Sequence, residues 1–555
     1  MKIDRGLILV LLPAVFLIFI HLHSISLWSP DEPREASISR HILHTGDYIV
    51  PIFNGKPLPW KPLLFHWCVL IPSVLAGDVN EFTARLPSAF SAIGLLILLY
   101  YFISRFLTAR TAFYSCLVLL TCYAFVEQAR LSTIDMLLTF LMFCALVFFY
   151  QGYRFPEKRK RYYLFFYLLC GLAVLAKGPV GIVLPGMIVF FFYLSEKKIK
   201  QLSELFCPAG IFAFLFSVLP WYLAVCFQGG EGFTYEFLIR QNFIRYLNAF
   251  DHVQPFYYYL QKIPSHFFPW SIFFPGALVF FMKDFFHRKK EIPADSSLRR
   301  FILIWLITVF LFFSLSKSKR SQYILLLYPV MSLMIGAFWN RFHEEKRENQ
   351  GFSPLWIRIP AELFVLGAGF VLLLFPYVTT SFPGFDGSYY RVNFVWSLIL
   401  TGFVIYVAAA LFEKKPCLLG RKIFTRIFMF TLAGLVFMVT SLYPQFDSVR
   451  SAVYDAVSIS KTVGKAEMIS YDFERPEFVF YLNRDSWKCF EPEERNEFLS
   501  YLKQHDVYCL IPRYRYEEVK AELNKMKTVS IVLKNIYGWK YNCLLLSNRL
   551  PGRAD

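Results

Sequence analysis

Long apolar runs alternate with short polar clusters over most of this chain. Runs of roughly 16 to 22 apolar residues recur up to about residue 444, which is the length of helix that crosses a bilayer. The pattern predicts thirteen spanning helices, at about 6–27, 83–104, 111–128, 133–151, 162–177, 179–195, 207–227, 268–283, 301–315, 322–340, 359–379, 394–412 and 424–443.

One apolar run decides the topology. "PLLFHWCVLIPSVLAG" (62–77) has about 16 residues and two prolines, so it lies at the lower limit for crossing. If it lies along the outer interface instead, the later Lys and Arg clusters all fall on the side of the N-terminal "MKIDR", as the positive-inside rule requires. We therefore expect a cytoplasmic N-terminus and external loops at 28–82 and 228–267.

The external segments contain patterns of regular structure. Residues 31–45 predict a short interfacial helix, because Gly46 offers a stop. Its start is either a capping box of Ser29, Pro30 and Glu32 or Asp31 itself. Residues 234–247 predict a second amphipathic surface helix.

Beyond about residue 444 the composition becomes more polar. "AEMISYDF", "PEFVFYL", "VYCLIPR", "VSIVLKN" and "CLLLSN" predict strands, with helical patterns near 447–463, 491–505 and 515–526 between them. We expect an all-α polytopic membrane domain over 1–444 and a small α/β domain over 445–555 outside the membrane, in the periplasm.

Composition and charge narrow the class. With 56% apolar and 18% charged residues, the chain is a polytopic membrane protein and not an ordinary soluble enzyme. Its net charge of +18 does not indicate nucleic-acid binding, because Lys and Arg fall in short clusters between apolar runs. The eleven cysteines show no CxxC or metal-ligand spacing, which assigns them no redox function.

Ionisable residues gather at the predicted outer ends of the spans, where such residues are functional candidates by default. They are Asp31, Glu32, Lys56, Lys61, Arg130, Asp135, Lys177, Arg240, Arg245, Lys317, Lys319 and Arg320. A few carboxylates among many cations suit an anionic substrate embedded in the membrane, such as a lipid phosphate. Purely structural interpretations also stay open. Glu32 can serve only as a charge at the helix start, and Asp135 can form a structural ion pair with Arg130.

Five segments in order carry a resemblance. They are "PDEPREASISRHILHTGDYIVP", "KPLPWKPLLFHW", "EQARLSTIDMLLTF", "AKGPVGIVLPG" and "KSKRSQYILLLYPVMSLM". Together they resemble the bacterial GT-C class glycosyltransferases related to protein O-mannosyltransferases, and among these the aminoarabinose lipid A transferases. The resemblance implies a GT-C-like fold of about thirteen transmembrane helices with an external C-terminal domain.

The resemblance also implies roles for single residues. Asp31 matches the proposed base, and Asp135 matches a second acidic position of the motif. Lys61, Arg245 and Tyr323 match residues that bind the phosphate of the lipid carrier. Lys319 is a further phosphate-binding candidate from the charge pattern, and Glu32, Lys56, Arg130 and Lys177 are other candidates near the site.

A zinc ion is bound in related transferases by a Glu before the "KP" and a His in the later external loop. This chain has Trp60 and Asn242 at those positions, so the metal is not carried over.

The implied function is transfer of a sugar, 4-amino-4-deoxy-L-arabinose or similar, from undecaprenyl phosphate to lipid A or a related envelope glycolipid at the inner membrane. With one carboxylate on the attacking face, direct displacement with inversion is the simpler mechanism. One alternative is a protein O-mannosyltransferase-like enzyme that acts on Ser or Thr. Another is a polyprenyl-phosphate carrier without chemistry, although the chain lacks the matching half-repeats typical of transporters.

Overall fold

The computed structural model describes residues 4–28, 30–237, 240, 252–286, 293–342, 353–380, 387–484, 486–526, 529–536 and 542–548. The chain divides into two compact units. The first comprises Met1–Leu22, Pro59–Phe65 and Arg85–Tyr443, and the second comprises His23–Leu58, His66–Ala84 and Pro444–Asp555.

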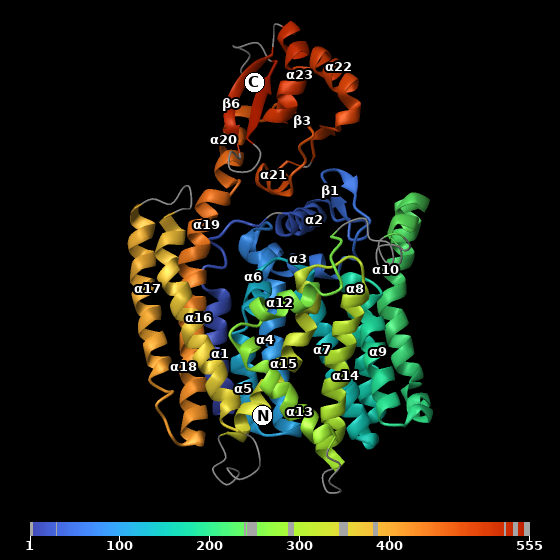
Figure 1. Cartoon of the computed structure of the whole chain (residues 1–555). Helices are drawn as coiled ribbons and strands as arrows, with labels where there is room; N and C mark the ends of the chain where they lie inside the picture. Colours follow the sequence, from blue (N-terminus) through green and yellow to red (C-terminus); the bar gives the residue numbers. More distant parts are fainter. Residues whose placement is uncertain are drawn as a thin grey trace. The chain divides into compact units, whose positions relative to one another are not determined.

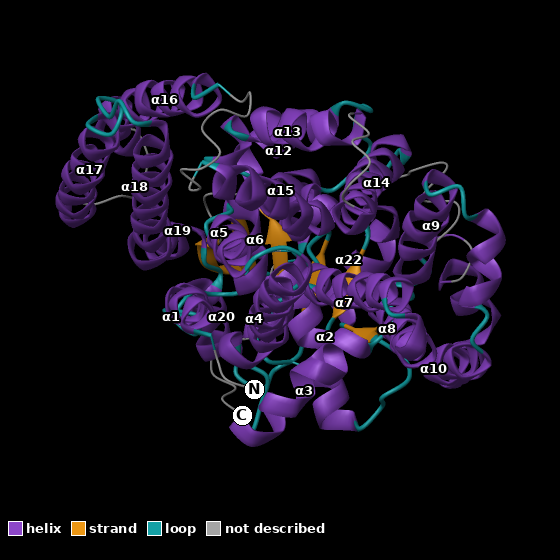
Figure 2. Cartoon of the chain, turned by 90° about the horizontal axis from the view of Figure 1, so that it is seen from below, coloured by secondary structure: helices purple, strands orange, loops and turns teal. Residues whose placement is uncertain are grey.

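The first unit is built of helices that run mostly side by side (Figures 1 and 2). Its helices are α1 (Arg5–Phe19), α4 (Glu81–Phe106), α5 (Ala109–Leu120), α6 (Tyr123–Arg130), α7 (Ile134–Arg154), α8 (Arg159–Lys177), α9 (Val180–Ser195), α10 (Pro208–Tyr235), α12 (Tyr258–His266), α13 (Phe274–Phe286), α14 (Pro293–Leu315), α15 (Tyr328–Arg341), α16 (Leu355–Thr380), α17 (Gly387–Ala408) and α18 (Pro416–Phe437). Short 3-10 segments include η1 (Pro156–Lys158), η2 (Ile199–Leu205), η4 (Trp270–Ile272) and η5 (Ser321–Leu327), and a π-helical turn, η7 (Met438–Leu442), follows α18. The prediction of a helical membrane domain is confirmed.

Among the described residues, eight helices are long and apolar enough to cross a membrane. The span predicted over 111–128 corresponds to the pair α5 and α6, a ninth candidate that bends by 66° at a short break. At the break, the hydroxyl of Thr121 donates to the carbonyl of Leu117 and accepts a 2.9 Å hydrogen bond from the indole of Trp270. Part of the surface helix predicted at 234–247 lies outside the described residues.

Close packing fixes the ends of α8 and α9, where the sequence reads "KGPVG". Gly178 has φ of 92°, a value that side chains rarely allow, and it turns the chain after Lys177. A Cβ on Gly181 would lie 2.4 Å from the backbone of Ala173, so only glycine lets the two helices approach this closely. Further along, buried rings such as those of Tyr150 and Phe301 stack 4.9 Å apart and join α7 to α14.

The second unit contains a small α/β fold of three layers. Its five-stranded sheet has the order β4-β3-β5-β7-β6, with β4, β3 and β5 parallel and the last two strands antiparallel. The strands are β3 (Met468–Tyr471), β4 (Lys488–Phe490), β5 (Tyr508–Pro512), β6 (Ser530–Ile536) and β7 (Cys543–Ser547). Helices α20 (Val453–Val463) and α21 (Pro476–Tyr481) share one apolar core, and α22 (Arg495–Gln504) and α23 (Arg513–Lys525) share another. The sheet separates the two cores, because the neighbouring residues Met468 and Ile469 of β3 point to opposite faces and belong to different cores.

One prediction about this sheet is wrong, and one of its strands was not predicted. The segment "PEFVFYL" forms α21 and not a strand, because Pro476 suits the first helical turn and the Phe478 and Val479 side chains are both buried there. Strand β4 was not predicted, since its three residues are too few to show alternation. The described cysteines of this domain, Cys489, Cys509 and Cys543, are free thiols.

The same unit includes the segments near the membrane surface. They form α2 (Asp31–Thr45), α3 (Leu64–Ala76) and the hairpin of β1 (Ile52–Phe53) and β2 (Lys56–Pro57), and α19 (Tyr443–Arg450) leads into the C-terminal fold. At about 1.5 Å per residue α3 is too short to cross a bilayer. Its outer face carries Ile71, Val74 and Leu75, which are 65–89% exposed, as suits a helix that lies along the interface.

Helix α2 is bonded directly to the C-terminal fold. Arg40 donates to the carbonyl of Phe480 at 2.8 Å and to that of Val79 at 2.6 Å. Asn54 accepts from the backbone N–H of Trp487 at 3.0 Å, and the backbone N–H of Leu27 donates to the Tyr481 hydroxyl at 2.7 Å. The contacts to Phe480, Trp487 and Tyr481 each cross more than 400 positions of sequence, and α2 and the sheet domain belong to the same compact unit.

Candidate active site

Asp31 is the first residue of α2, and the helix start differs in detail from the predicted capping box. Pro30 is the N-cap and makes no side-chain cap hydrogen bond, while Glu32 accepts from the backbone N–H of Trp28 at 2.8 Å. Gly46 ends the helix with φ of 73°, as predicted. The Asp31 side chain is 18% exposed in the first turn, where the helix dipole favours a carboxylate.

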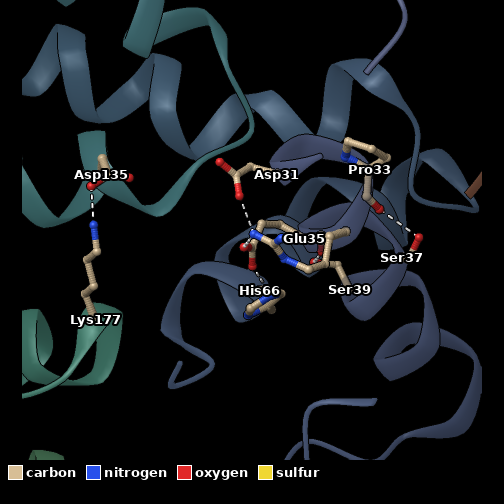
Figure 3. A network of polar contacts seen from close by, with 9 residues as sticks. Asp31, Pro33, Glu35, Ser37, Ser39, His66, Asp135 and Lys177 are labelled. Carbon is tan, nitrogen blue, oxygen red and sulfur yellow. Dashed lines mark hydrogen bonds and ion pairs between the residues drawn. The ribbon is translucent and has the colours of Figure 1, made fainter. Parts of the chain in front are cut away.

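Within the second unit, a buried polar network connects Asp31 with Glu35 and His66 (Figure 3). The guanidinium of Arg34 donates to Asp31 and, at 3.2 Å, to Glu35. The second oxygen of Glu35 lies 3.0 Å from Nε2 of His66 on α3. Burial alone would lower the pKa of Arg34, but the charges of Glu35 and Asp31 outweigh it and raise that pKa above its ordinary value.

The first unit holds a separate acid–base cluster. Asp135 lies in the first turn of α7 and forms an ion pair with Lys177 at the last position of α8. The Lys177 ammonium also lies 4.5 Å from the centre of the Tyr323 ring, which η5 presents. Three of the predicted site residues from distant parts of the sequence are therefore brought together, and the two charged ones are at most 16% exposed.

Two other candidates make structural contacts. Arg130 donates to the carbonyls of Leu17 and Ile18 at 2.7 and 2.8 Å, while Asp135 forms its ion pair with Lys177. The ammonium of Lys319 donates to the carbonyls of Gln254, at 3.0 Å, and Ser316, and burial lowers its pKa. Lys319 thus ties together the two loop segments next to η5, and its role in phosphate binding stays a prediction.

The remaining candidates divide between the units. Lys56 is exposed on β2 in the second unit, and Lys61 is half-buried in the first. Arg245 lies outside the described residues. That Asp31 meets Lys61 and Tyr323 in one pocket stays a prediction.

Sequence reasoning missed Arg34, Glu35 and His66 as members of the site. The spacing of Asp31 and Arg34, three positions apart in a predicted helix, was a usable signal. The pair of Glu35 and His66 had none, because these residues are 31 positions apart on different helices.

The zinc site of related transferases has no matching donor set here. The indole of Trp60 provides no lone pair for a metal, and Asn242 lies outside the described residues. No group of three His, Cys, Asp or Glu side chains suitable for a metal occurs within the described ranges. No step of the reaction is therefore assigned to a metal.

Comparison with known proteins places this site in a family. The family model described as dolichyl-phosphate-mannose-protein mannosyltransferase matches residues 60–222, which include Lys61, Asp135 and Lys177. An uncharacterised protein of Aquifex aeolicus is 30% identical over 383 residues, 68% of this chain and 72% of its own length. An undecaprenyl phosphate-alpha-4-amino-4-deoxy-L-arabinose arabinosyl transferase of Aeromonas salmonicida is 30% identical over 371 residues, 66% of each chain.

The chain belongs to the GT-C class of glycosyltransferases. The fold agrees: the crystal structure of ArnT from Cupriavidus metallidurans bound to undecaprenyl phosphate matches 99% of both chains with a TM-score of 0.79 at 21% identity. The prediction of a lipid-phosphate-sugar-dependent glycosyltransferase embedded in the membrane is confirmed. The chain spans 66% of the length of the Aeromonas transferase, just under two thirds.

Proposed function

We propose that this glycosyltransferase transfers 4-amino-4-deoxy-L-arabinose from undecaprenyl phosphate to lipid A or a related envelope glycolipid. The observation that carries the proposal is the 30% identity over 371 residues with a transferase named for that donor. The reaction takes place at the outer face of the inner membrane, with the N-terminus in the cytoplasm and the C-terminal domain in the periplasm. This orientation follows from the Lys and Arg clusters of the loops.

Asp31 acts as the general base in this proposal. An oxygen of the acceptor attacks the anomeric carbon of the sugar, the bond from that carbon to the carrier phosphate oxygen breaks, and the electron pair leaves on undecaprenyl phosphate. Asp31 takes the acceptor proton, and the configuration at the anomeric carbon inverts. The Asp31 carboxylate accepts from Arg34 and is 18% exposed, so it is held in place and an acceptor can reach it.

Cations and a hydroxyl stabilise the departing phosphate in this scheme. Lys61, Arg245 and Tyr323 bind the phosphate oxygens, where negative charge builds up as the bond breaks. The ion pair of Asp135 with Lys177 supports the arrangement, because the Lys177 ammonium packs on the face of the Tyr323 ring. Asp135 then acts by fixing Lys177.

A second candidate acceptor is a protein Ser or Thr hydroxyl. The match of residues 60–222 to the mannosyltransferase model supports this alternative. The chemistry at the donor is the same, and the two candidates differ only in what approaches Asp31.

The test uses the full chain in detergent with undecaprenyl phosphate-linked aminoarabinose and, in separate reactions, lipid A or a Ser/Thr peptide. Mass spectrometry should show an added sugar on lipid A only. Asp31→Asn should lower the rate by about 10² to 10⁴, the usual worth of a general base. Asp47→Asn is the matched control, because the Oδ1 of Asp47 caps the backbone N–H groups of Ile49 and Val50 and an amide oxygen can replace it.

Transfer by Asp31→Asn at the parental rate contradicts the base assignment. Sugar on the peptide and not on lipid A favours the second candidate. Movement of the carrier lipid across a vesicle membrane with no sugar transferred contradicts both.

A further inference from the structure

Arg34 is shared between two carboxylates in the core of the second unit. Its Nη2 donates to Oδ1 of Asp31 and also to Oε1 of Glu35, at 3.2 Å. The side chain of Arg34 is 10% exposed and that of Glu35 is 3% exposed, so both charges are largely withdrawn from water. One buried cation therefore faces two anions, and only Asp31 keeps appreciable access to solvent.

His66 holds the second carboxylate from the other side. Its Nε2 lies 3.0 Å from Oε2 of Glu35, and its side chain is 1% exposed. Each oxygen of Glu35 thus has its own partner, Arg34 on one and His66 on the other (Figure 3). A buried carboxylate that is bonded at both oxygens cannot rotate without losing a hydrogen bond that water does not replace.

We infer that Glu35 and His66 are positioning residues that hold Arg34 and thereby set the orientation and the basicity of the Asp31 carboxylate. The inference rests on the proposed function, in which Asp31 is the base. Glu35 and His66 act only through Arg34, because both are buried and the substrate is expected at the more exposed Asp31.

The physical reason is competition for one guanidinium. An Arg that pairs with a single carboxylate lowers the pKa of that carboxyl group by about 1–3 units, which makes a weak base. Glu35 takes a share of Arg34, and two carboxylates then face one guanidinium, so Asp31 keeps more affinity for a proton than it would in a one-to-one pair. Glu32, the other carboxylate at the helix start, is unchanged in every variant below.

The test is the pH profile of kcat/KM for transfer to lipid A by the full-length enzyme. Glu35→Gln removes the carboxylate that competes with Asp31 for Arg34, so the acid limb should move to lower pH by about one unit, and kcat near neutral pH should fall about threefold or more. His66→Phe removes the donor to Glu35, which then competes harder for Arg34, and the acid limb should move to higher pH. His66→Gln places an amide donor near Nε2 and should restore the parental profile.

Asp78→Asn is the matched control. Asp78 is half-buried in the same unit and accepts a 3.2 Å hydrogen bond from Arg40, which lies on the same helix as Arg34. This variant should lower the thermal unfolding midpoint in detergent and leave the pH profile unchanged. The KM for the undecaprenyl phosphate-linked donor should stay within about twofold in all variants, since other side chains bind the donor phosphate in the proposed function.

Two outcomes overturn the inference. One is a parental pH profile in Glu35→Gln. The other is a shift in the same direction in Glu35→Gln and His66→Phe, because competition for Arg34 requires opposite signs. The proposed function fails separately: if Asp31→Asn transfers sugar at the full rate, Asp31 is not the base whatever the other variants do, whereas an inactive Asp31→Asn with an unshifted Glu35→Gln contradicts only the positioning role.

Discussion

Replacing Lys177 with Met should destabilise the first unit strongly, because it leaves Asp135 buried without its cation. Asp135 is 9% exposed and Lys177 is 16% exposed, so this is a buried ion pair and not a surface one. Removal of one partner from such a pair costs about 3–5 kcal/mol, and the partial exposure of Lys177 places the expected loss near the lower end, at about 3 kcal/mol.

The double variant Asp135→Asn with Lys177→Met separates charge from packing. It leaves no unpaired charge, so we expect it to cost about 1 kcal/mol and to recover most of the stability that Lys177→Met loses. The matched control is Arg159→Met at the other end of α8, where Arg159 pairs with Glu204 at 2.8 Å and the two side chains are 24% and 32% exposed. That pair should contribute about 1 kcal/mol or less.

The assay is the thermal unfolding midpoint in detergent, followed by the transfer rate of the same samples. The double variant should be nearly as stable as the parent and still inactive, because the Tyr323 ring has lost the ammonium that packs on its face. If Lys177→Met lowers the midpoint no more than Arg159→Met does, the buried-pair argument is refuted. A double variant with parental transfer would remove Lys177 and Asp135 from the site.

Two further predictions concern a hydroxyl and an imidazole. Tyr323→Phe keeps the ring beside Lys177 and removes only the hydroxyl. Affinity for undecaprenyl phosphate should therefore fall about 10- to 100-fold, which is the worth of a hydrogen bond to a charged group, while the unfolding midpoint stays unchanged. Parental affinity would exclude the hydroxyl from phosphate binding. Burial lowers the pKa of His266 to about 4, and its Nδ1 lies 3.1 Å from the Tyr328 hydroxyl. Because the folded-state pKa lies below the unfolded value of about 6.5, the unfolded chain binds the extra proton first, and the stability that neutral His266 contributes should be lost as pH falls from about 6.5 to 4. His266→Gln should flatten that part of the curve of unfolding midpoint against pH, and an unchanged slope would contradict the assignment.

The sequence was a good guide to the fold class, since long apolar runs have few possible interpretations. It was a poor guide to where helices break. Thr121, the C-cap of α5, accepts a hydrogen bond from Trp270, 149 positions away, and no local pattern contains that contact. The three-residue strand β4 shows the same limit, because parallel pairing with β3 and not alternation makes it a strand.

The candidate site divides in the same way. Asp31 and Asp135 are carboxylates at the predicted membrane level, and this residue type at that place was enough to indicate a functional role. Their partners were assigned less well: Asp135 pairs with Lys177 at the end of another helix, and the nearer Arg130 binds carbonyls of α1. Partner choice depends on which helix ends meet in space, and one sequence does not encode that in any short window.

The hydrogen bonds that Arg40 and Asn54 make to the C-terminal fold have a consequence for how such enzymes diversify. A chimera that joins residues 444–555 of one relative to the rest of another would leave these donors and acceptors without their partners, unless residues 23–58 and 66–84 were exchanged as well. The part of this protein that would have to be exchanged as a whole is therefore three stretches of chain, 23–58, 66–84 and 444–555. The first of these stretches contains Asp31. Changes in the tail are therefore constrained by the helix that bears Asp31, and recombination at a single junction near 444 should seldom yield a working hybrid.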